Sequence, residues 1–354
     1  MIEFWTLAIA AVTALACALS GTFLVLKREA LVSEGLAHAV LPGIVIAYAL
    51  IGDRTSPLLL VGAAAMGLVM ILAVQAVRRT GVVDATASLG VVFPALFSVG
   101  VLLTSMDLAG TYFHADCIIE GNLALAPLDR LEVGGRDLGP RAFWSVSVAL
   151  LLVTGFVALL FKELKLLTFD PELAASLGFR PNRVHLAWLA VVSFTVVASF
   201  EAAGSILVVA LMIAPPAAAV LWVDDVRHIL GLAGVLGLVS AFAGHELGMA
   251  MDIAPAGPMA TSAGALFLGS LALAPRGILM KGRAHRHLLA RMEVDLVAAR
   301  LRPGAPRDLE SVRGELGWSP RRFDAVVARA VSGAGLVHDA AAGTLHLAAR
   351  QPGS

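Results

Sequence analysis

Nine runs of mostly apolar residues, each about 20 residues long, constrain this chain more than any other feature. A helix needs roughly that length to cross the hydrocarbon core of a bilayer. The runs do not alternate between apolar and polar residues, which argues against a β-barrel, and lipid admits no other spanning structure. We therefore predict an all-α polytopic membrane protein. The runs are residues 4–26, 31–52, 57–77, 82–103, 142–161, 184–200, 204–223, 229–249 and 258–274.

Composition supports this class and divides the chain. Hydrophobic residues make up 58% and charged residues 15% of the sequence, against about 25% charged residues in soluble proteins. Residues 276–354 hold 13 of the 26 Lys and Arg but only 7 of the 26 Asp and Glu. We predict a transmembrane domain over residues 1–280 and a basic cytosolic domain over 281–354. The cysteines, Cys17 and Cys117, predict neither a disulfide framework nor a CxxC site.

The loops between the runs differ in basic charge, which predicts the orientation. With nine spans, most loop Lys and Arg and the whole tail fall on one side, and cytosolic loops carry this excess. We therefore expect the N-terminus outside and the C-terminus in the cytosol, although three arginines in the outer loop 105–141 depart from the rule. The basic positions on the cytosolic side are Lys27, Arg28, Arg78, Arg79, Lys162, Lys165, Arg180, Arg183, Arg227 and His228.

The tail returns to the patterning of a soluble protein. Residues 287–301 are amphipathic, residues 308–316 and 320–331 predict two short helices, and residues 336–339 and 344–348 predict a hairpin. A helix–turn–helix followed by a hairpin is typical of a small α+β winged-helix domain.

The first candidate site is Glu34 with His38. Their i, i+4 spacing places both side chains on one helix face, and a carboxylate with an imidazole can bind a divalent metal ion. Ionisable groups within a spanning helix usually face a cavity or a partner. The alternative is that Glu34 pairs with Lys27 or Arg28 while His38 is simply buried. The following Pro42-Gly43 suggests a break in this helix.

A short helix is predicted over residues 171–177, in the longest loop of the cytosolic side. Asp170 would be its N-cap, Pro171 its first residue and Gly178 its stop. Such a helix could dock into a soluble partner, or it could be an ordinary connector.

Three other residues are candidates for a pathway or gate: Glu201, His245 and Glu246. Glu201 could instead simply end its helix. His245-Glu246 begins like the HExxH zinc-protease motif, but the second histidine is replaced by Met249, which argues against a protease. The outer loop gathers Asp107, His114, Asp116, Cys117 and Glu120, which we interpret as a surface that contacts a soluble partner outside.

Five segments together resemble one family, the permeases of bacterial manganese, zinc and iron ABC importers. They are residues 26–31 with 34–43, 116–122, 169–178, 204–219 and 255–258, and the resemblance extends over about residues 5–280. Two positions depart from the family pattern. Glu34 stands where Asp is commoner, and Glu120 where Tyr is frequent.

The resemblance implies a multi-pass protein of the bacterial inner membrane that acts as a permease, not as an enzyme. It implies that Glu34 and His38 are ligands of the transported ion (manganese, zinc or iron), and two facing permeases would supply four ligands. It also makes Asp170, Pro171, Glu172, Ala174 and Gly178 the coupling segment. No GxxxxGK[ST] motif occurs, so ATP is expected on a separate ATPase subunit. No permanent cofactor is expected.

The implied partners are the ATPase, a second permease that is identical or different, an extracytoplasmic metal-binding protein and the lipid bilayer. Some members of the family carry a similar tail, for which we favour a regulatory or protein-contact role. Nucleic acid is not expected as a partner, because a membrane tether restricts the search for DNA. The alternative function is a membrane-tethered, metal-responsive regulator that acts through the tail.

Overall fold

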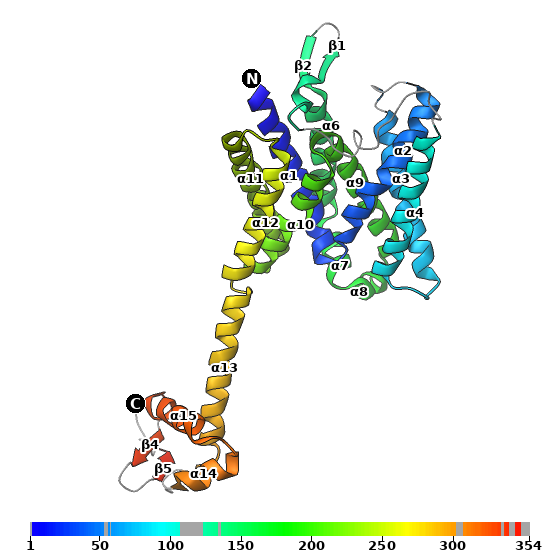
Figure 1. Cartoon of the computed structure of the whole chain (residues 1–354). Helices are drawn as coiled ribbons and strands as arrows, with labels where there is room; N and C mark the ends of the chain where they lie inside the picture. The colour runs from blue at the N-terminus through cyan, green and yellow to red at the C-terminus, as the bar shows by residue number, and fades with distance from the viewer. Residues whose placement is uncertain are drawn as a thin grey trace. The chain divides into compact units, whose positions relative to one another are not determined.

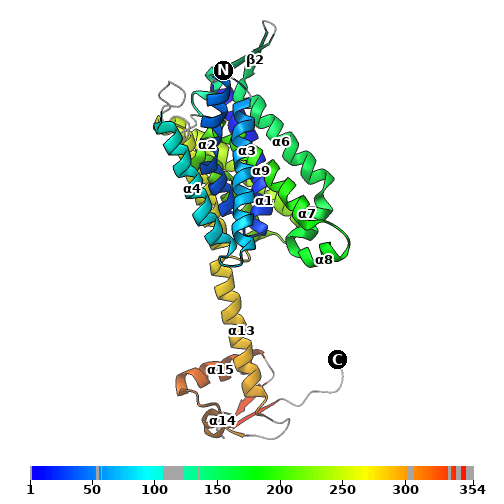
Figure 2. The same cartoon turned by 90° about the vertical axis from the view of Figure 1, so that its right-hand side faces the viewer.

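The computed structural model describes residues 2–52, 56, 58–106, 123–133, 136–301, 307–333, 336–339 and 344–347. The chain divides into two compact units, Met1–Ala274 and Pro275–Ser354. This boundary lies earlier than the one expected after residue 280. Figures 1 and 2 show the helices of each unit from two sides.

The first unit is a bundle of long apolar helices. Within the described residues, nine helices are long and apolar enough to cross a membrane, which confirms the predicted all-α polytopic class. They are α1 (Ile2–Leu26), α2 (Leu31–Ile51), α3 (Leu58–Arg79), α4 (Ala85–Ser105), α6 (Arg141–Leu159), α9 (Pro181–Ala203), α10 (Ser205–Trp222), α11 (Val226–Met251) and α12 (Ala256–Leu273).

Two groups of helices share this bundle. Helices α1, α10, α11 and α12 pack together, α2 packs on α3 and α4, and α9 contacts members of both groups. Small residues allow close approach between membrane helices, and many of the buried positions are alanines, such as Ala10, Ala14 and Ala198. The hydroxyl of Ser193 on α9 donates to the carbonyl of Ala64 on α3 at 3.1 Å. Helix α9 therefore packs against the group that carries α2 and is hydrogen-bonded to it at this point.

Helix α2 is continuous, which corrects the predicted break at Pro42-Gly43. It runs from Leu31 to Ile51 with Pro42 inside. A Cβ atom on Gly43 would lie 2.7 Å from both the carbonyl oxygen of Gly62 and Cβ of Met66 on α3. Gly43 is therefore needed for the close approach of α2 and α3, not for a change of chain direction.

The loop between α6 and α9 contains two helices where the sequence predicted one. Helix α8 (Pro171–Ser176) matches the prediction, and α7 (Phe161–Phe169) precedes it. Leu164 and Leu167 of α7 are buried, so this helix packs on the bundle through one apolar side.

At the other end of the bundle, the strands β1 (Arg130–Val133) and β2 (Arg136–Pro140) form an antiparallel hairpin. A short 3₁₀ helix, η1 (Ala126–Leu128), precedes them. The sequence treated this stretch as loop. The guanidinium of Arg130 lies 2.9 Å from the carboxylate of Asp137, and the indole of Trp144 donates to the carbonyl of Leu138 at 2.9 Å.

The second unit is a small α+β fold. Its elements are α13 (Ile278–Ala298), β3 (Arg307–Asp308), α14 (Leu309–Leu316), α15 (Pro320–Gly333), β4 (Leu336–Asp339) and β5 (Thr344–Leu347). The strands form one antiparallel sheet in the order β3-β5-β4. Its core includes Val297, Val312, Phe323, Val326 and Leu345. The predicted helices and hairpin are present, whereas strand β3 was not foreseen.

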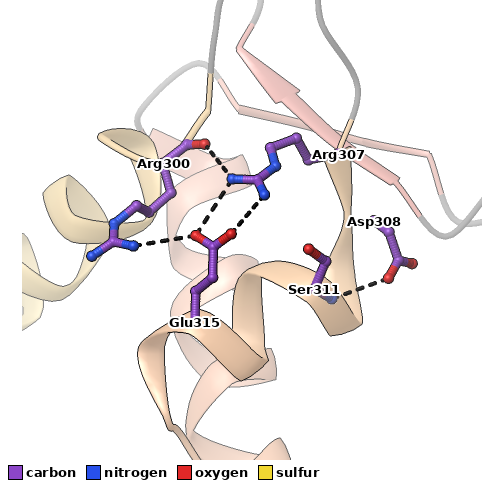
Figure 3. Close-up of polar contacts among 5 residues, drawn as sticks. All are labelled: Arg300, Arg307, Asp308, Ser311 and Glu315. Atoms are coloured by element: carbon purple, nitrogen blue, oxygen red, sulfur yellow. Dashed lines mark hydrogen bonds and ion pairs between the residues drawn. The ribbon is translucent and has the colours of Figure 1, made fainter.

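Ion pairs join the last turn of α14 to Arg300, which follows α13, and to Arg307 of β3 (Figure 3). The carboxylate of Glu315 lies 3.2 Å from the guanidinium of Arg300 and 2.7 Å from that of Arg307. Asp308 caps α14 by accepting the backbone N–H of Ser311 at 3.0 Å. Hydrogen bonds from both guanidinium groups lower the pKa of Glu315, and their positive charges act in the same direction.

Candidate functional site

Glu34 and His38 lie on the face of α2 that turns away from the core of this unit. Glu34 is exposed and His38 is half-buried, whereas Ser33, Gly35 and Ala39 are buried. The i, i+4 spacing therefore gives the shared face that the sequence predicted. A membrane helix that leaves a carboxylate on its surface requires a partner or a water-filled cavity there.

Two phenylalanines of α4 hold the imidazole of His38. The ring of Phe93 stacks on it with the centroids 5.8 Å apart and the planes 20° apart. The ring of Phe97 meets it edge-on at 5.5 Å. These contacts restrict the rotamer of His38 while leaving its nitrogens without a competing ion pair among the described residues.

Pro42 adds an oxygen to this part of α2. Proline has no N–H, so the carbonyl of His38 lacks the donor that a regular helix would supply four residues later. A carboxylate, an imidazole and a carbonyl oxygen are all suitable ligands for first-row divalent metal ions. Within the described residues, no group of three or more His, Cys, Asp or Glu side chains is placed to hold a metal ion. Glu34 and His38 are therefore two side-chain ligands that no third His, Cys, Asp or Glu joins within the described ranges.

The structure does not support the alternative in which Glu34 pairs with Lys27 or Arg28. Among the described residues, no ion pair involves Glu34. Lys27 instead contacts His185, with Nζ 2.8 Å from Nδ1. The base on that side of α2 is thus already engaged.

Helix α8 has the cap and the stop that its sequence predicted. The carboxylate of Asp170 accepts the N–H of Leu173 at 2.9 Å, Pro171 opens the helix, and Gly178 has a φ of 84°. Ala174 is buried while Glu172 is exposed. Exposed apolar side chains surround the helix, namely Phe169, Leu173, Leu177 and Phe179.

The other three predicted residues lie on two helices. Glu201 is in the last turn of α9. His245 and Glu246 are neighbours on α11, but His245 is buried and Glu246 is exposed, because successive side chains point in different directions. Nδ1 of His245 has no hydrogen-bond partner among the described residues. The structure therefore does not gather these three with Glu34 and His38.

The metal-attracting residues of the outer loop, Asp107, His114, Asp116, Cys117 and Glu120, lie outside the described residues.

A polar cluster that the sequence analysis missed lies where α1, α2 and α9 meet. His185 contacts both Lys27 and Glu29, with its Nδ1 2.8 Å from Nζ of Lys27 and its Nε2 3.4 Å from Oε2 of Glu29. Burial lowers the pKa of Lys27, and the charge of Glu29 partly offsets this effect. In the sequence, this cluster was indicated only by the position of His185, just inside the spanning run 184–200 and close to Arg180 and Arg183.

The nine spanning helices within the described chain and the capped helix between two of them define a polytopic helical membrane protein. Comparison with known families is more specific. The chain belongs to the ABC 3 transport family, whose model matches residues 1–274.

Individual relatives agree with this family. The manganese transport system membrane protein MntD of Bacillus subtilis is 35% identical over 280 residues, which cover 79% of this chain and 95% of that protein. The zinc transport system membrane protein TroD of Treponema pallidum is 38% identical over 331 residues, 91% of this chain and 90% of that protein. That length exceeds the first unit, so the likeness to TroD extends into the tail.

The fold also matches a solved structure, PsaBC from Streptococcus pneumoniae in complex with Fab. The TM-score is 0.65 at 21% identity, with 79% of this chain and 94% of that chain covered.

Proposed function

We propose that this chain is the membrane-spanning permease of an ATP-driven importer whose cargo is manganese or zinc. The family supports the transport role, and the names of MntD and TroD support these two ions. Iron stays a prediction from the sequence. Membership of a transport family also favours a permease over the enzyme and regulator alternatives.

The observation that carries the proposal is the exposed face of α2 with Glu34 and His38. A carboxylate and an imidazole there suit manganese or zinc, and the Phe93 and Phe97 contacts hold the imidazole in place. One chain offers two side-chain ligands, so a second permease, identical or related, would complete a four-ligand site. This face is exposed in the single chain, and in the assembled importer the second permease would cover it.

ATP would act from outside this chain. The apolar side chains around α8 would enter a groove of an ATPase subunit, in the way amphipathic helices bind grooves. Closure of two ATPase subunits would then move α8, and α9 would carry the motion into the bundle. This requires α8 in the cytosol, and hence the N-terminus outside, where an extracytoplasmic metal-binding protein would deliver the ion.

The tail supports a protein-contact role better than DNA binding. Its helices and its β3-β5-β4 sheet are consistent with a winged-helix domain. However, its ion pairs already engage several of its arginines: Arg300, Arg307, Arg313 and Arg322. On α15, the exposed positions include Asp324 and Ala328, which do not suit phosphate contacts, but also Arg321, which does. The preference for protein contact therefore rests on the ion pairs.

Metal analysis of cells tests the proposal. Cells that lack the protein should contain less manganese or zinc than wild-type cells, and the wild-type gene should restore the content. A gene carrying both Glu34→Ala and His38→Ala, with equal protein in the membrane, should not. Manganese, zinc and iron are measured together. Equal contents of all three in every strain would contradict the proposal.

A further inference from the structure

A histidine joins the α1–α2 turn to α9 through two polar contacts. Nδ1 of His185 lies 2.8 Å from Nζ of Lys27, and Nε2 of the same ring lies 3.4 Å from Oε2 of Glu29. An ammonium group can only donate hydrogen bonds, so Nδ1 accepts and the ring proton resides on Nε2, facing Glu29. The neutral imidazole thus lies between a cation, to which it is hydrogen-bonded, and a carboxylate whose Oε2 receives no hydrogen bond within the described part of the chain. We call these three residues the histidine bridge.

The turn that carries Lys27 and Glu29 is held firmly by its backbone. The N–H groups of Lys27 and Glu29 donate to the carbonyls of Phe23 and Leu24 at 3.0 and 2.8 Å. Arg28 between them has a φ of 60°, a conformation that few residues other than glycine adopt. Displacing Glu29 therefore displaces the whole turn.

The turn is also the start of α2. The carbonyl of Glu29 accepts the N–H of Val32 at 2.9 Å. Glu34 follows Glu29 by five residues, roughly 7 Å along a helix axis. A movement of Glu29 is therefore transmitted directly to Glu34 and His38.

On the other side of the bridge, His185 belongs to the helix that follows α8. Helix α9 begins at Pro181, and α8 ends at Ser176. The link between them is closed by a hydrogen bond from the N–H of Phe179 to the carbonyl of Ala174 at 3.1 Å. The connection is too short and too well bonded to absorb much movement of α8, so His185 follows that movement.

The bridge borders a cleft that offers Glu29 a second partner. The cleft is small and is lined by Glu29, Gln75, Arg78 and His185, together with apolar side chains. Among the described residues, Arg78 makes no ion pair. When α9 draws His185 away, the carboxylate of Glu29 can exchange its imidazole partner for this guanidinium. Such an exchange gives the element two discrete arrangements, which coupling between distant sites requires.

We propose that Lys27, Glu29 and His185 are positioning residues that couple the movement of α8 to the metal-binding face of α2. This inference rests on the proposed function, because it assumes that α8 receives the ATPase and that α2 carries the ligands. None of the three residues needs to touch the ion.

The test uses the full permease, reconstituted in proteoliposomes with its ATPase and its metal-binding partner, and measures manganese or zinc uptake and ATP hydrolysis in the same samples. His185→Leu should lower the number of ions imported per ATP by roughly fivefold or more, while ATP hydrolysis continues. His185→Gln should restore most of the ratio, because its amide can accept from Lys27 and donate to Glu29. His228→Leu is the control, since the side chain of His228 is 77% exposed and pairs with Asp225 at the start of its own helix, at 3.6 Å.

A second measurement separates coupling from simple damage to the fold. Glu29→Gln and His185→Leu should together lower the ratio by no more than the worse single variant, because both break one contact. Additive losses would overturn the proposal. So would an unchanged ratio in His185→Leu, or an equal fall of uptake and hydrolysis in both His185 variants. If the wild-type complex imports neither metal, the proposed function fails; if it imports normally and the ratio is unchanged, only the bridge fails.

Discussion

At the scale of single residues, the α2 face combines two proposed ligands of the ion, of which one side chain is held in place by its neighbours and the other is not. His38 is held by two aromatic rings, whereas Glu34 is exposed without an ion pair among the described residues. The spacing of the two residues and their shared face could be predicted from the sequence because i, i+4 geometry is local. The phenylalanine contacts and the histidine bridge could not, since they join residues of different helices.

Glu315 gives the tail a pH dependence. Its pKa is lowered below the ordinary value of a glutamate by the hydrogen bonds that it accepts from Arg307 and Arg300. The ion pairs therefore stabilise the tail above the unfolded-state pKa, and this contribution is lost as the pH falls through the lower folded-state pKa. Glu315→Gln should lower the unfolding temperature of the tail at pH 7 and leave it unchanged near the acid limit, as measured by calorimetry of the full chain.

Glu310→Gln is the matched control for this pH effect. Glu310 is also exposed, but it pairs only with Arg313 one turn along its own helix. Such pairs contribute little, so this variant should unfold like the wild type at pH 7. Equal losses in the two variants would count against the Glu315 ion pairs.

At the scale of elements, the positions of the helices along the chain could be predicted from the sequence, whereas the contacts between helices could not. The nine spans followed from apolar length alone, and the cap and stop of α8 followed from Asp170, Pro171 and Gly178. The predicted break at Pro42-Gly43 was wrong because the glycine serves the packing of α2 against α3. Strand β3 and the outer hairpin escaped prediction because short strands depend on partners distant in sequence.

Gly43→Ala tests that packing. The new Cβ would collide with the backbone of Gly62 and with Met66, and overpacking of this kind typically costs about 1–3 kcal/mol. Thermal unfolding of the purified protein should shift to lower temperature. The control is Gly90→Ala on α4, where nothing lies within 4 Å of the added Cβ; an equal shift in both variants would show that Gly43 has no special packing role.

The surface around α8 tests the docking interpretation. Glu172 is exposed on that helix, so Glu172→Arg should leave the permease folded while reversing the charge it presents to the ATPase. We expect ATP hydrolysis by the assembled complex to become less dependent on metal delivery, with uptake reduced. Glu310→Arg in the tail serves as a charge-matched control, and unchanged coupling in Glu172→Arg would argue against α8 as the docking helix.

At the scale of the whole molecule, we assign transport to the first unit and a protein-contact role to the tail. The family model covers the first unit, residues 1–274, and MntD aligns over about that length of the chain. The fold class and the division into two parts could be predicted because they depend on summed hydropathy and charge. The ligand set could be predicted only in part, since half of it would come from a second subunit.

Deletion of residues 290–354 should therefore leave metal uptake largely intact when ATPase and metal are both in ample supply. The dependence of uptake on the external metal concentration should change, because the tail is expected to regulate transport. Uptake is measured in cells over a range of external metal concentrations, with membrane levels of the protein matched. The regulator alternative predicts the reverse: function lost with the tail, and Glu34 and His38 dispensable.

The most direct test of the central claim is uptake of radioactive manganese or zinc by the reconstituted complex when Glu34 or His38 is replaced by alanine. Each replacement removes a ligand and should lower uptake at least about tenfold, while the protein remains folded in the membrane and Glu34→Asp retains most of the uptake. Normal uptake by either alanine variant would contradict the assignment of the α2 face as the path of the ion.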